Sequence, residues 1–409
     1  REYGRAVVEI CGGRLFRGLG PRETVWMSHG DHVETAPPAF SVTARTENAP
    51  VAAFEDPARG LYGIQGHPEV HHSEHGAAML ENFLGDVCGA KPTWTMASFR
   101  DASVLQLRRT VSEGVVLGAL SGGVDSTVAA VLVREALGER FHGVFVDTGL
   151  LRKDEGRLVL ENFRHLGLPV RGVDASERFF RALDGVEEPE RKRRIIGGLF
   201  IDVFTEEAAR IPGATWLLQG TLYPDVIESV SIKGPSAVIK THHNVGGLPE
   251  KLDFRLVEPL RELFKDEVRR LGEELGIPHD MLWRHPFPGP GLAVRMPGPV
   301  TRDRVRILQE ADAIFLDELR AAGFYDATAQ AFAVLLPVRS VGVMGDGRTY
   351  ENVVALRAVT TEDFMTADWA RLPHDLLDRC ARRIVGEVRG VNRVVYDVTS
   401  KPPGTIEWE

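Results

Sequence analysis

The sequence has few cysteines, no long apolar run and no excess of positive charge. Its three cysteines, Cys11, Cys88 and Cys380, are far apart and form no CxxC pair, which argues against a disulfide framework or a zinc site and favours a reducing compartment. No apolar run approaches the roughly 18 residues that cross a membrane. The net charge of −9 argues against nucleic-acid binding, which usually requires a basic domain. We expect a cytoplasmic protein with neither nucleic-acid nor membrane partners.

The length indicates more than one domain. A chain of 409 residues exceeds one hydrophobic core, so two or three domains are expected. Residues 1–93 contain short strand-like runs, a helix-like stretch and the start of a polar, aromatic linker. Residues 94–285 alternate apolar strands with helices, and residues 286–409 predict a small α+β domain. The opening REYGRAVVEI has no Met and enters a strand-like run almost at once, so we expect a missing upstream segment.

A strand–turn–helix–strand pattern begins the second region. Gly114–Leu120 is a continuous apolar run, as expected for a strand buried on both faces. The turn SGGVDS and a helix-like stretch follow it, and His142–Gly149 gives a second apolar strand. This order is that of a βαβ unit, so the sequence predicts an α/β fold with a parallel sheet.

The turn SGGVDS has the composition of a phosphate-binding loop. Consecutive glycines let the backbone approach an anion, and N–H groups at the turn and helix start bind its oxygens. An aspartate in such a turn would repel phosphate unless a divalent metal bridges the two, so Asp125 suggests Mg²⁺. The alternative is an ordinary strand–helix turn with a polar N-cap. The candidate binding residues are Ser121, Gly122, Gly123, Val124, Asp125, Ser126 and Thr127.

The same string lacks the GxxxxGK[ST] and GxGxxG patterns. It resembles the loop of enzymes that split ATP into AMP and pyrophosphate. This resemblance implies that the loop binds ATP for adenylation, and that Val146 in the next strand reads adenine through its backbone. Ligands of open parallel sheets bind at the carboxyl edge, where this loop is expected.

Two later segments carry further candidates. Asp225 and Glu228 are three residues apart and would share a helix face, where they could hold Mg²⁺ or orient a substrate. An ordinary acidic first turn of a helix is the alternative. Lys240 precedes His242 and His243, and adjacent residues of an extended segment point to opposite faces, which disfavours a shared metal. A lid whose Lys240 meets a phosphate or a developing negative charge is the preferred interpretation.

Five strings together resemble the GMP synthetase family. They are GTLYPDVIES, IKTHHNVGGLP, HPFPGPGLAVR, VGVMGDGRTYE and SKPPGTIEWE, and the resemblance extends over residues 110–409. It implies that the 2-oxygen of XMP attacks the α-phosphorus of ATP, and that ammonia then displaces AMP to give GMP. Asp225, Glu228 and Lys240 would belong to the activation site. XMP would be held by Arg295, Lys401, Ile406 and Glu407, and residues 286–409 would form a homodimer interface.

Residues 1–90 resemble the C-terminal part of a class I glutamine amidotransferase. The strings WMSHGD and GIQGHPE carry this resemblance, which implies that His67 is the base of a catalytic cysteine and that Glu69 orients His67. A lone HPE would otherwise be interpreted as a turn. The chain has no Gly-x-Cys-x-Gly elbow, Cys11 is interpreted as structural, and Gly66 stands where the family has a large aromatic residue. We therefore expect the chain as given to use free ammonia rather than glutamine.

Other functions remain open at this point. NAD synthetase or a tRNA thiolase could use the same loop, although a thiolase would require a basic RNA surface and usually more cysteines. A nucleotide-binding regulator without turnover and an isolated glutaminase subunit are the remaining alternatives.

Overall fold

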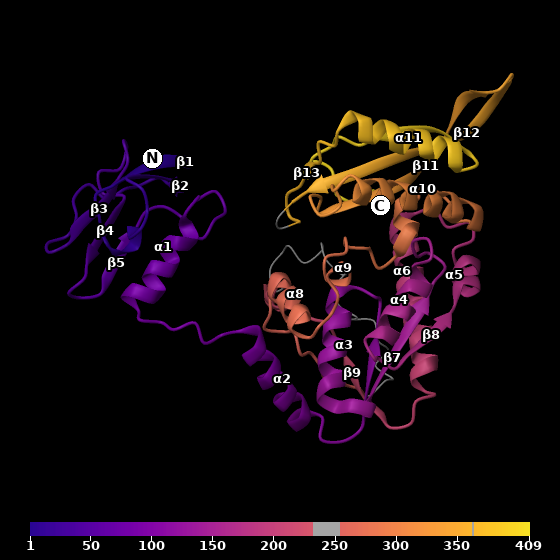
Figure 1. Cartoon of the computed structure of the whole chain (residues 1–409), viewed down its shortest axis with the longest axis horizontal. Helices are drawn as coiled ribbons and strands as arrows, with labels where there is room; N and C mark the ends of the chain where they lie inside the picture. Colours follow the sequence, from indigo (N-terminus) through magenta and orange to yellow (C-terminus); the bar gives the residue numbers. More distant parts are fainter. Residues whose placement is uncertain (232–253, 362–363) are drawn as a thin grey trace. The chain divides into compact units, whose positions relative to one another are not determined.

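The computed structural model describes residues 1–231, 254–361 and 364–409, and it comprises two compact units, Arg1–Thr95 and Met96–Glu409 (Figure 1). Within these described ranges, no helix is long and apolar enough to cross a membrane. The predicted domain boundaries at residues 93 and 285 stay predictions.

The first unit is built on an antiparallel sheet of five strands in the order β2-β1-β3-β4-β5. A short helix, α1 (Gly76–Asn82), packs Met79 into a core with Val8, Val25 and Met27. The short strands of the sheet agree with the strand-like runs predicted within residues 1–93. The strands are β1 (Glu2–Ile10), β2 (Arg22–His29), β3 (Ser41–Arg45), β4 (Ala53–Asp56) and β5 (Leu61–Ile64).

The second unit contains the predicted parallel sheet, with strand order β10-β9-β6-β7-β8. Its strands are β6 (Val115–Ala119), β7 (Phe141–Asp147), β8 (Val170–Asp174), β9 (Ala214–Leu218) and β10 (Arg255–Val257). Its helices are α2 (Met96–Thr110), α3 (Val124–Leu137), α4 (Glu155–His165), α5 (Ser176–Ala182), α6 (Pro189–Ala208), α7 (Tyr223–Ser231), α8 (Lys265–Glu274) and α9 (His279–Leu282).

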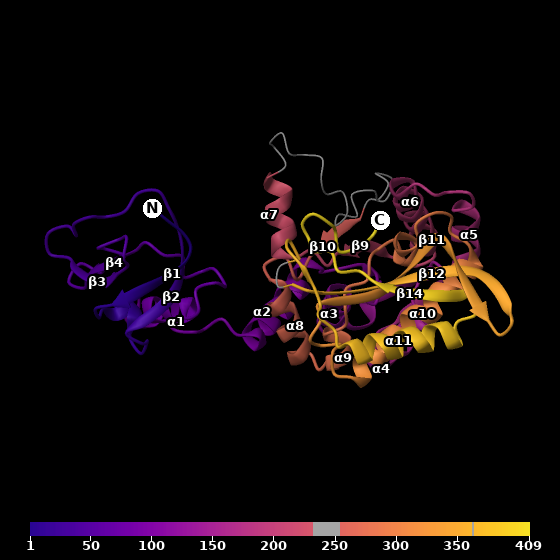
Figure 2. The same ribbon diagram turned by 90° about the horizontal axis from the view of Figure 1, so that it is seen from above.

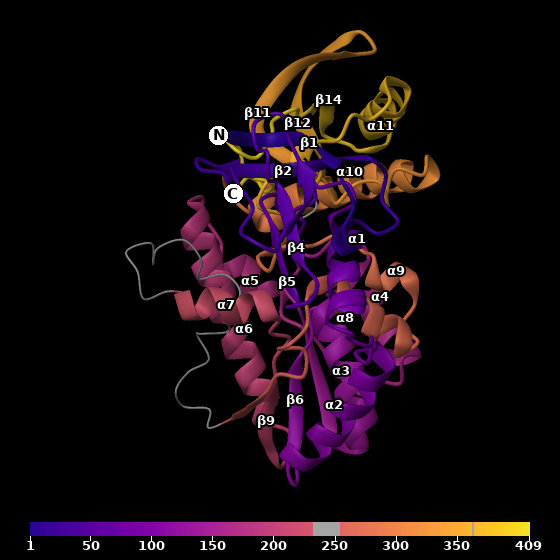
Figure 3. The same cartoon turned by 90° about the vertical axis from the view of Figure 1, so that its left-hand side faces the viewer.

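Helices cover both faces of this sheet, because successive strand side chains point to opposite sides. Val116 and Leu218 pack with side chains of α2, α3 and α8, whereas Leu117 and Leu217 pack with side chains of α6. Figure 3 shows these helix groups on either side of β6 and β9. The loops that follow the parallel strands lie at the carboxyl edge of the sheet.

A second sheet follows in the chain, with β12 pairing antiparallel to β11 and β13 and parallel to β14. Helices α10 and α11 pack on one face, and Ile406 of the C-terminal tail packs on the other. Figure 2 shows β14 beside β12 with both helices along the sheet. The elements are α10 (Arg302–Ala321), β11 (Gln330–Met344), β12 (Gly347–Thr360), β13 (Asp368–Trp369), α11 (His374–Glu387) and β14 (Val391–Tyr396).

The Pro/Gly-rich segment between the sheets is a packed loop rather than an exposed linker. Leu292, Ala293, Val294 and Arg295 are all fully buried. Gly291 has a φ of +64°, and a Cβ on it would lie 2.4 Å from the Leu150 carbonyl oxygen. Only glycine allows this approach, and the loop joins the two sheets through one continuous core.

Candidate functional site

The glycine loop connects β6 to α3 at the carboxyl edge of the sheet, as predicted. Gly122 has a φ of +75°, and a Cβ there would lie 2.6 Å from Val159, so the loop requires glycine at this position. Gly123 ends the loop, and its N–H donates to Ser121 Oγ at 3.2 Å. The loop backbone thus places an N–H group and the exposed Ser121 hydroxyl at the start of a helix, where an anion is favoured.

The side chains of other predicted loop residues make contacts within the protein. Ser126 Oγ and Thr127 Oγ1 both donate to the Gly123 carbonyl oxygen, at 3.0 and 2.8 Å. Val124 and Thr127 are buried, and Val124 belongs to the core beneath the loop. These hydroxyls hold the shape of the loop, and Val124 and Thr127 offer a ligand little beyond their backbone.

Asp125 faces a lysine that sequence analysis missed. Lys265, the first residue of α8, donates to both carboxylate oxygens of Asp125. The helix dipole disfavours a cation at the start of a helix. The unusual position of Lys265 was therefore the one sequence feature that could have indicated a function for it. The pair puts a positive charge beside the loop.

The neighbouring strands complete this edge. Gly220 follows β9, and a Cβ on it would contact Asp125 at 3.5 Å. Asp225 Oδ2 accepts the Leu222 N–H at 2.9 Å, so the carboxylate holds the start of α7. Val146 is 4% exposed, which leaves only its backbone for a ligand. The side chain of Glu228 and all of Lys240 lie outside the described residues.

Asp147 ends β7 at the same edge. Its Oδ1 accepts the Gly149 N–H at 2.8 Å. Burial raises the pKa of this carboxyl, with like charge from Asp174 and Glu155 acting in the same direction. Asp147 is not among the predicted site residues, although it lies within the predicted second strand, His142–Gly149.

Two of the predicted XMP residues, Arg295 of the loop between the sheets and Glu407 of the tail, contact each other. Arg295 is fully buried, and its guanidinium makes two hydrogen bonds to Glu407, at 2.8 and 3.0 Å. The ring of Phe332 lies 4.1 Å from the guanidinium and packs with Ile406. Gln330 Nε2 donates to the same carboxylate at 2.7 Å. Burial and pairing with Glu407 leave the Arg295 guanidinium no exposed charge, and its expected contact with XMP stays a prediction.

Lys401 lies apart from this pair. Its Nζ donates to the Phe364 carbonyl oxygen at 2.6 Å, and its backbone pairs with Ala367. It is half-buried, so its ammonium group is the more accessible of the two predicted cations.

A buried cation that sequence analysis missed shapes the tail. Arg357 of β12 is 1% exposed, pairs with Asp397 and donates to the carbonyl oxygens of Thr399, Thr405 and Ile406. A single arginine in the otherwise apolar run VVALRAV was the available signal.

In the first unit, the His67 Nδ1 atom lies 2.8 Å from the Glu69 Oε1 atom. A backbone hydrogen bond and the His67 side chain lower the pKa of Glu69. The His67 backbone is fixed by a bond to the Trp26 carbonyl oxygen and by the Ser73 hydroxyl. Gly66 is buried, with Val25 3.1 Å from where its Cβ would lie, so Val25 occupies the space beside it.

Three family models match the chain: Glutamine amidotransferase class-I over residues 2–87, NAD synthase over 100–192, and GMP synthase C terminal domain over 317–408. The curated proteins named GMP synthase [glutamine-hydrolyzing] from Brucella suis (strain ATCC 23445 / NCTC 10510), Brucella abortus (strain S19) and Brucella ovis are each 59% identical over 415 residues. The match covers 100% of this chain and 80% of each relative.

Proposed function

We infer the reaction from the premise that this chain belongs to the family of glutamine-hydrolysing GMP synthases. It is a carbon–nitrogen ligase that makes GMP from XMP, ATP and glutamine-derived or free ammonia. The reaction passes through adenyl-XMP and releases AMP and pyrophosphate. The observation that carries this conclusion is 59% identity over the whole chain, including the glycine loop.

We propose that the glycine loop binds the phosphates of ATP. The 2-oxygen of XMP attacks the α-phosphorus, and the bond to the β-phosphate oxygen breaks as pyrophosphate leaves with the electron pair. Ammonia then adds at carbon 2, and AMP departs with the former 2-oxygen. Lys265, which pairs with Asp125 of the loop, would then lie beside the phosphates as charge grows on them, and a preorganised cation stabilises such charge. Asp225, Glu228 and Lys240 stay our candidates for XMP activation.

We propose that Mg²⁺ accompanies ATP. Both oxygens of the Asp125 carboxylate face Lys265, and no group of three or more acidic, His or Cys side chains suits a metal within the described parts of the chain. One carboxylate beside a phosphate loop fits Mg²⁺ that is held largely by substrate phosphates. When bound, the metal would neutralise phosphate charge, and Asp125 would hold it once Lys265, which pairs with both carboxylate oxygens in this structure, turns to the phosphates.

We propose that XMP lies against the C-terminal tail. Lys401 supplies the accessible cation for its 5′-phosphate, while Glu407 and Ile406 face the nucleoside. Arg295 then acts indirectly, by holding the carboxylate of Glu407 in place.

We propose that His67 and Glu69 serve glutamine hydrolysis with a cysteine nucleophile in the triad arrangement. None of the cysteines in these 409 residues stands in a Gly-x-Cys-x-Gly elbow. The expected nitrogen source for these residues alone is therefore free ammonia.

We also propose a cytoplasmic homodimer. The β11–β12 hairpin exposes Val338, Val341, Val343 and Tyr350 by 51–73%, an apolar surface that a second copy would cover.

The test is a reaction of the purified chain with XMP, ATP, Mg²⁺ and ammonium. Equal formation of GMP, AMP and pyrophosphate is expected, and Asp125→Asn should abolish all three. Formation of ADP instead of AMP, or no loss of XMP, would overturn the proposed function. AMP formation with nicotinic acid adenine dinucleotide in place of XMP would favour the NAD synthase alternative.

A further inference from the structure

Arg284 holds the face of the glycine loop that is opposite to its anion-binding side. Its Nη1 donates to the Gly122 carbonyl oxygen at 2.7 Å, and its Nη2 pairs with Glu155. Arg284 follows α9 in the chain, and Glu155 is the first residue of α4. The glycine loop is thus tied to two elements that the sequence does not place beside it.

Because a peptide bond is planar, the contact of Arg284 with the Gly122 carbonyl oxygen also determines the direction of the Gly123 N–H. The bond between Gly122 and Gly123 is trans, so its C=O and N–H point in opposite directions. With the carbonyl turned to Arg284, the N–H of Gly123 points to the other side, where Ser121 Oγ accepts it. A flipped peptide would present a carbonyl oxygen to phosphate, and the conformational freedom of glycine makes such a flip accessible.

We propose that Arg284 is a positioning residue for ATP, because it fixes this peptide so that the Gly123 N–H faces the phosphates. Arg284 does not touch the substrate. It acts by holding one of two orientations of a single peptide group, and removing it releases the Gly122 carbonyl. The proposal rests on the proposed function only in naming ATP as the ligand of the loop.

The guanidinium is itself held in place. The Glu155 side chain is 9% exposed, and its second oxygen accepts the Arg152 N–H at 2.9 Å. The Arg152 side chain then pairs with Asp312 of α10 at 3.0 Å. Asp312 is 1% exposed and accepts the Ala333 N–H at 2.9 Å. The support for the loop therefore extends from α4 to the second sheet.

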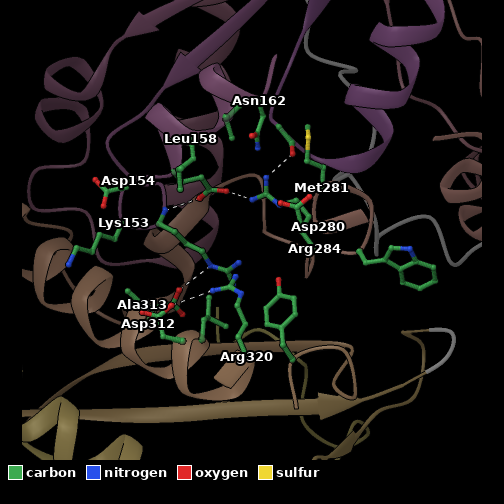
Figure 4. Close-up of a pocket in the computed structure, with 18 of the residues that line it drawn as sticks. Lys153, Asp154, Leu158, Asn162, Asp280, Met281, Arg284, Asp312, Ala313 and Arg320 are labelled. Carbon is green, nitrogen blue, oxygen red and sulfur yellow. Dashed lines mark hydrogen bonds and ion pairs between the residues drawn. The ribbon is translucent and has the colours of Figure 1, made fainter. Parts of the chain in front are cut away.

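A cavity of about 770 Å³ lies beside this network and is lined by Gly122, Glu155, Arg284 and Asp312 among others. Figure 4 shows Arg284 and Asp312 on different sides of it. The cavity is large enough for a free guanidinium ion. Truncation of Arg284 would thus leave a space that a small cation can enter, which permits chemical rescue.

The experiment measures KM for ATP, KM for XMP and kcat in the ammonium-dependent reaction. Arg284→Ala should raise KM for ATP by about tenfold or more, the range expected for losing a hydrogen bond from a charged group. KM for XMP should change by less than about twofold, because the tail contacts are intact. Ethylguanidinium at low millimolar concentration should restore the KM for ATP, and Arg284→Lys should fall between the two.

Arg157→Ala is the matched control. Arg157 lines the same cavity and is 60% exposed, but it pairs with Glu161 of its own helix. It should keep the wild-type KM for ATP and show no response to ethylguanidinium. An unchanged KM for ATP in Arg284→Ala, or equal rises in both KM values without rescue, would overturn the proposal.

Failure of Arg284→Ala to fold and absence of GMP formation by the wild-type chain have different consequences. If Arg284→Ala does not fold, Arg284→Lys replaces it, and an unchanged KM for ATP in that variant overturns the positioning role. If the wild-type chain forms no GMP, the proposed function fails instead. Binding of ATP to both proteins, measured by calorimetry, then still decides the role of Arg284.

Discussion

Lys265 donates to both carboxylate oxygens of Asp125, at 2.5 and 2.6 Å, across 140 residues of sequence. The lysine begins α8 and the aspartate lies in the first turn of α3. Because Asp125 follows the two glycines, the pair places a cation beside the phosphate-binding backbone. Each side chain is partly exposed, at 44% and 31%, so the lysine can turn to a bound phosphate.

We predict that Lys265→Met lowers kcat with ammonium by about 10²–10³-fold, the usual effect of removing one preorganised group that stabilises transition-state charge. Lys265→Arg should retain part of the activity. The measurement is the rate of AMP formation at saturating ATP and XMP. Arg270→Met is the control, because Arg270 lies on the same helix, is 68% exposed and pairs with Asp266 one turn away. A wild-type rate in Lys265→Met would contradict the role of Lys265.

We predict that Glu407→Gln weakens XMP binding more than ATP binding. The change leaves the buried Arg295 without its opposite charge, and a buried ion pair that loses one partner is strongly disfavoured. KM for XMP should rise by about tenfold or more, while KM for ATP stays within about twofold. Glu387→Gln, on the exposed surface of α11, should leave both values unchanged. Equal changes of both KM values in Glu407→Gln would show a general loss of structure.

We predict that Arg357→Met lowers the free energy of unfolding of the second unit by about 3–5 kcal/mol, since Asp397 and three tail carbonyl groups lose their buried partner. Urea unfolding monitored by tryptophan fluorescence measures the change. Arg393→Met is the control, because Arg393 is exposed on the neighbouring strand β14. Equal stability of the two variants would mean that the tail is held by its apolar contacts alone.

We predict that His285 makes stability depend on pH below neutrality. Burial lowers the pKa of His285 from 6.5 to about 4. Its Nδ1 accepts the Ala331 N–H at 3.2 Å, and Nε2 lies 2.9 Å from the Tyr325 carbonyl oxygen, so the folded state holds the neutral ring. The unfolded chain takes up a proton first, and stability should therefore fall as pH drops from 6.5 towards 4, by up to about 3 kcal/mol.

The test of the histidine effect compares unfolding free energies in urea at pH 7, 6, 5 and 4.5. His285→Gln should flatten the dependence on pH, even though it lowers stability at pH 7. His374→Gln, which changes an exposed histidine at the start of α11, should keep the wild-type slope. The same slope in His285→Gln would assign the effect to other groups.

Sequence alone determined the elements whose cause is local. The apolar run before SGGVDS and the glycines within it predict a buried strand, a tight turn and a helix, because these depend on neighbouring residues. The pair His67 and Glu69 is local too, since only Pro68 stands between its members in the chain and 2.8 Å separates His67 Nδ1 from Glu69 Oε1.

Only the tertiary structure decided which charges meet. Arg284 contacts Gly122, 162 positions away in the chain, and Lys265 contacts Asp125, 140 positions away. No periodic pattern in the sequence predicts such contacts. Arg295 shows the same limit: the family resemblance implies that it holds XMP, and only the tertiary structure shows its guanidinium buried against Glu407. Local hydrogen bonds follow from the order of residues, whereas the partner of a buried charge depends on which distant elements pack around it.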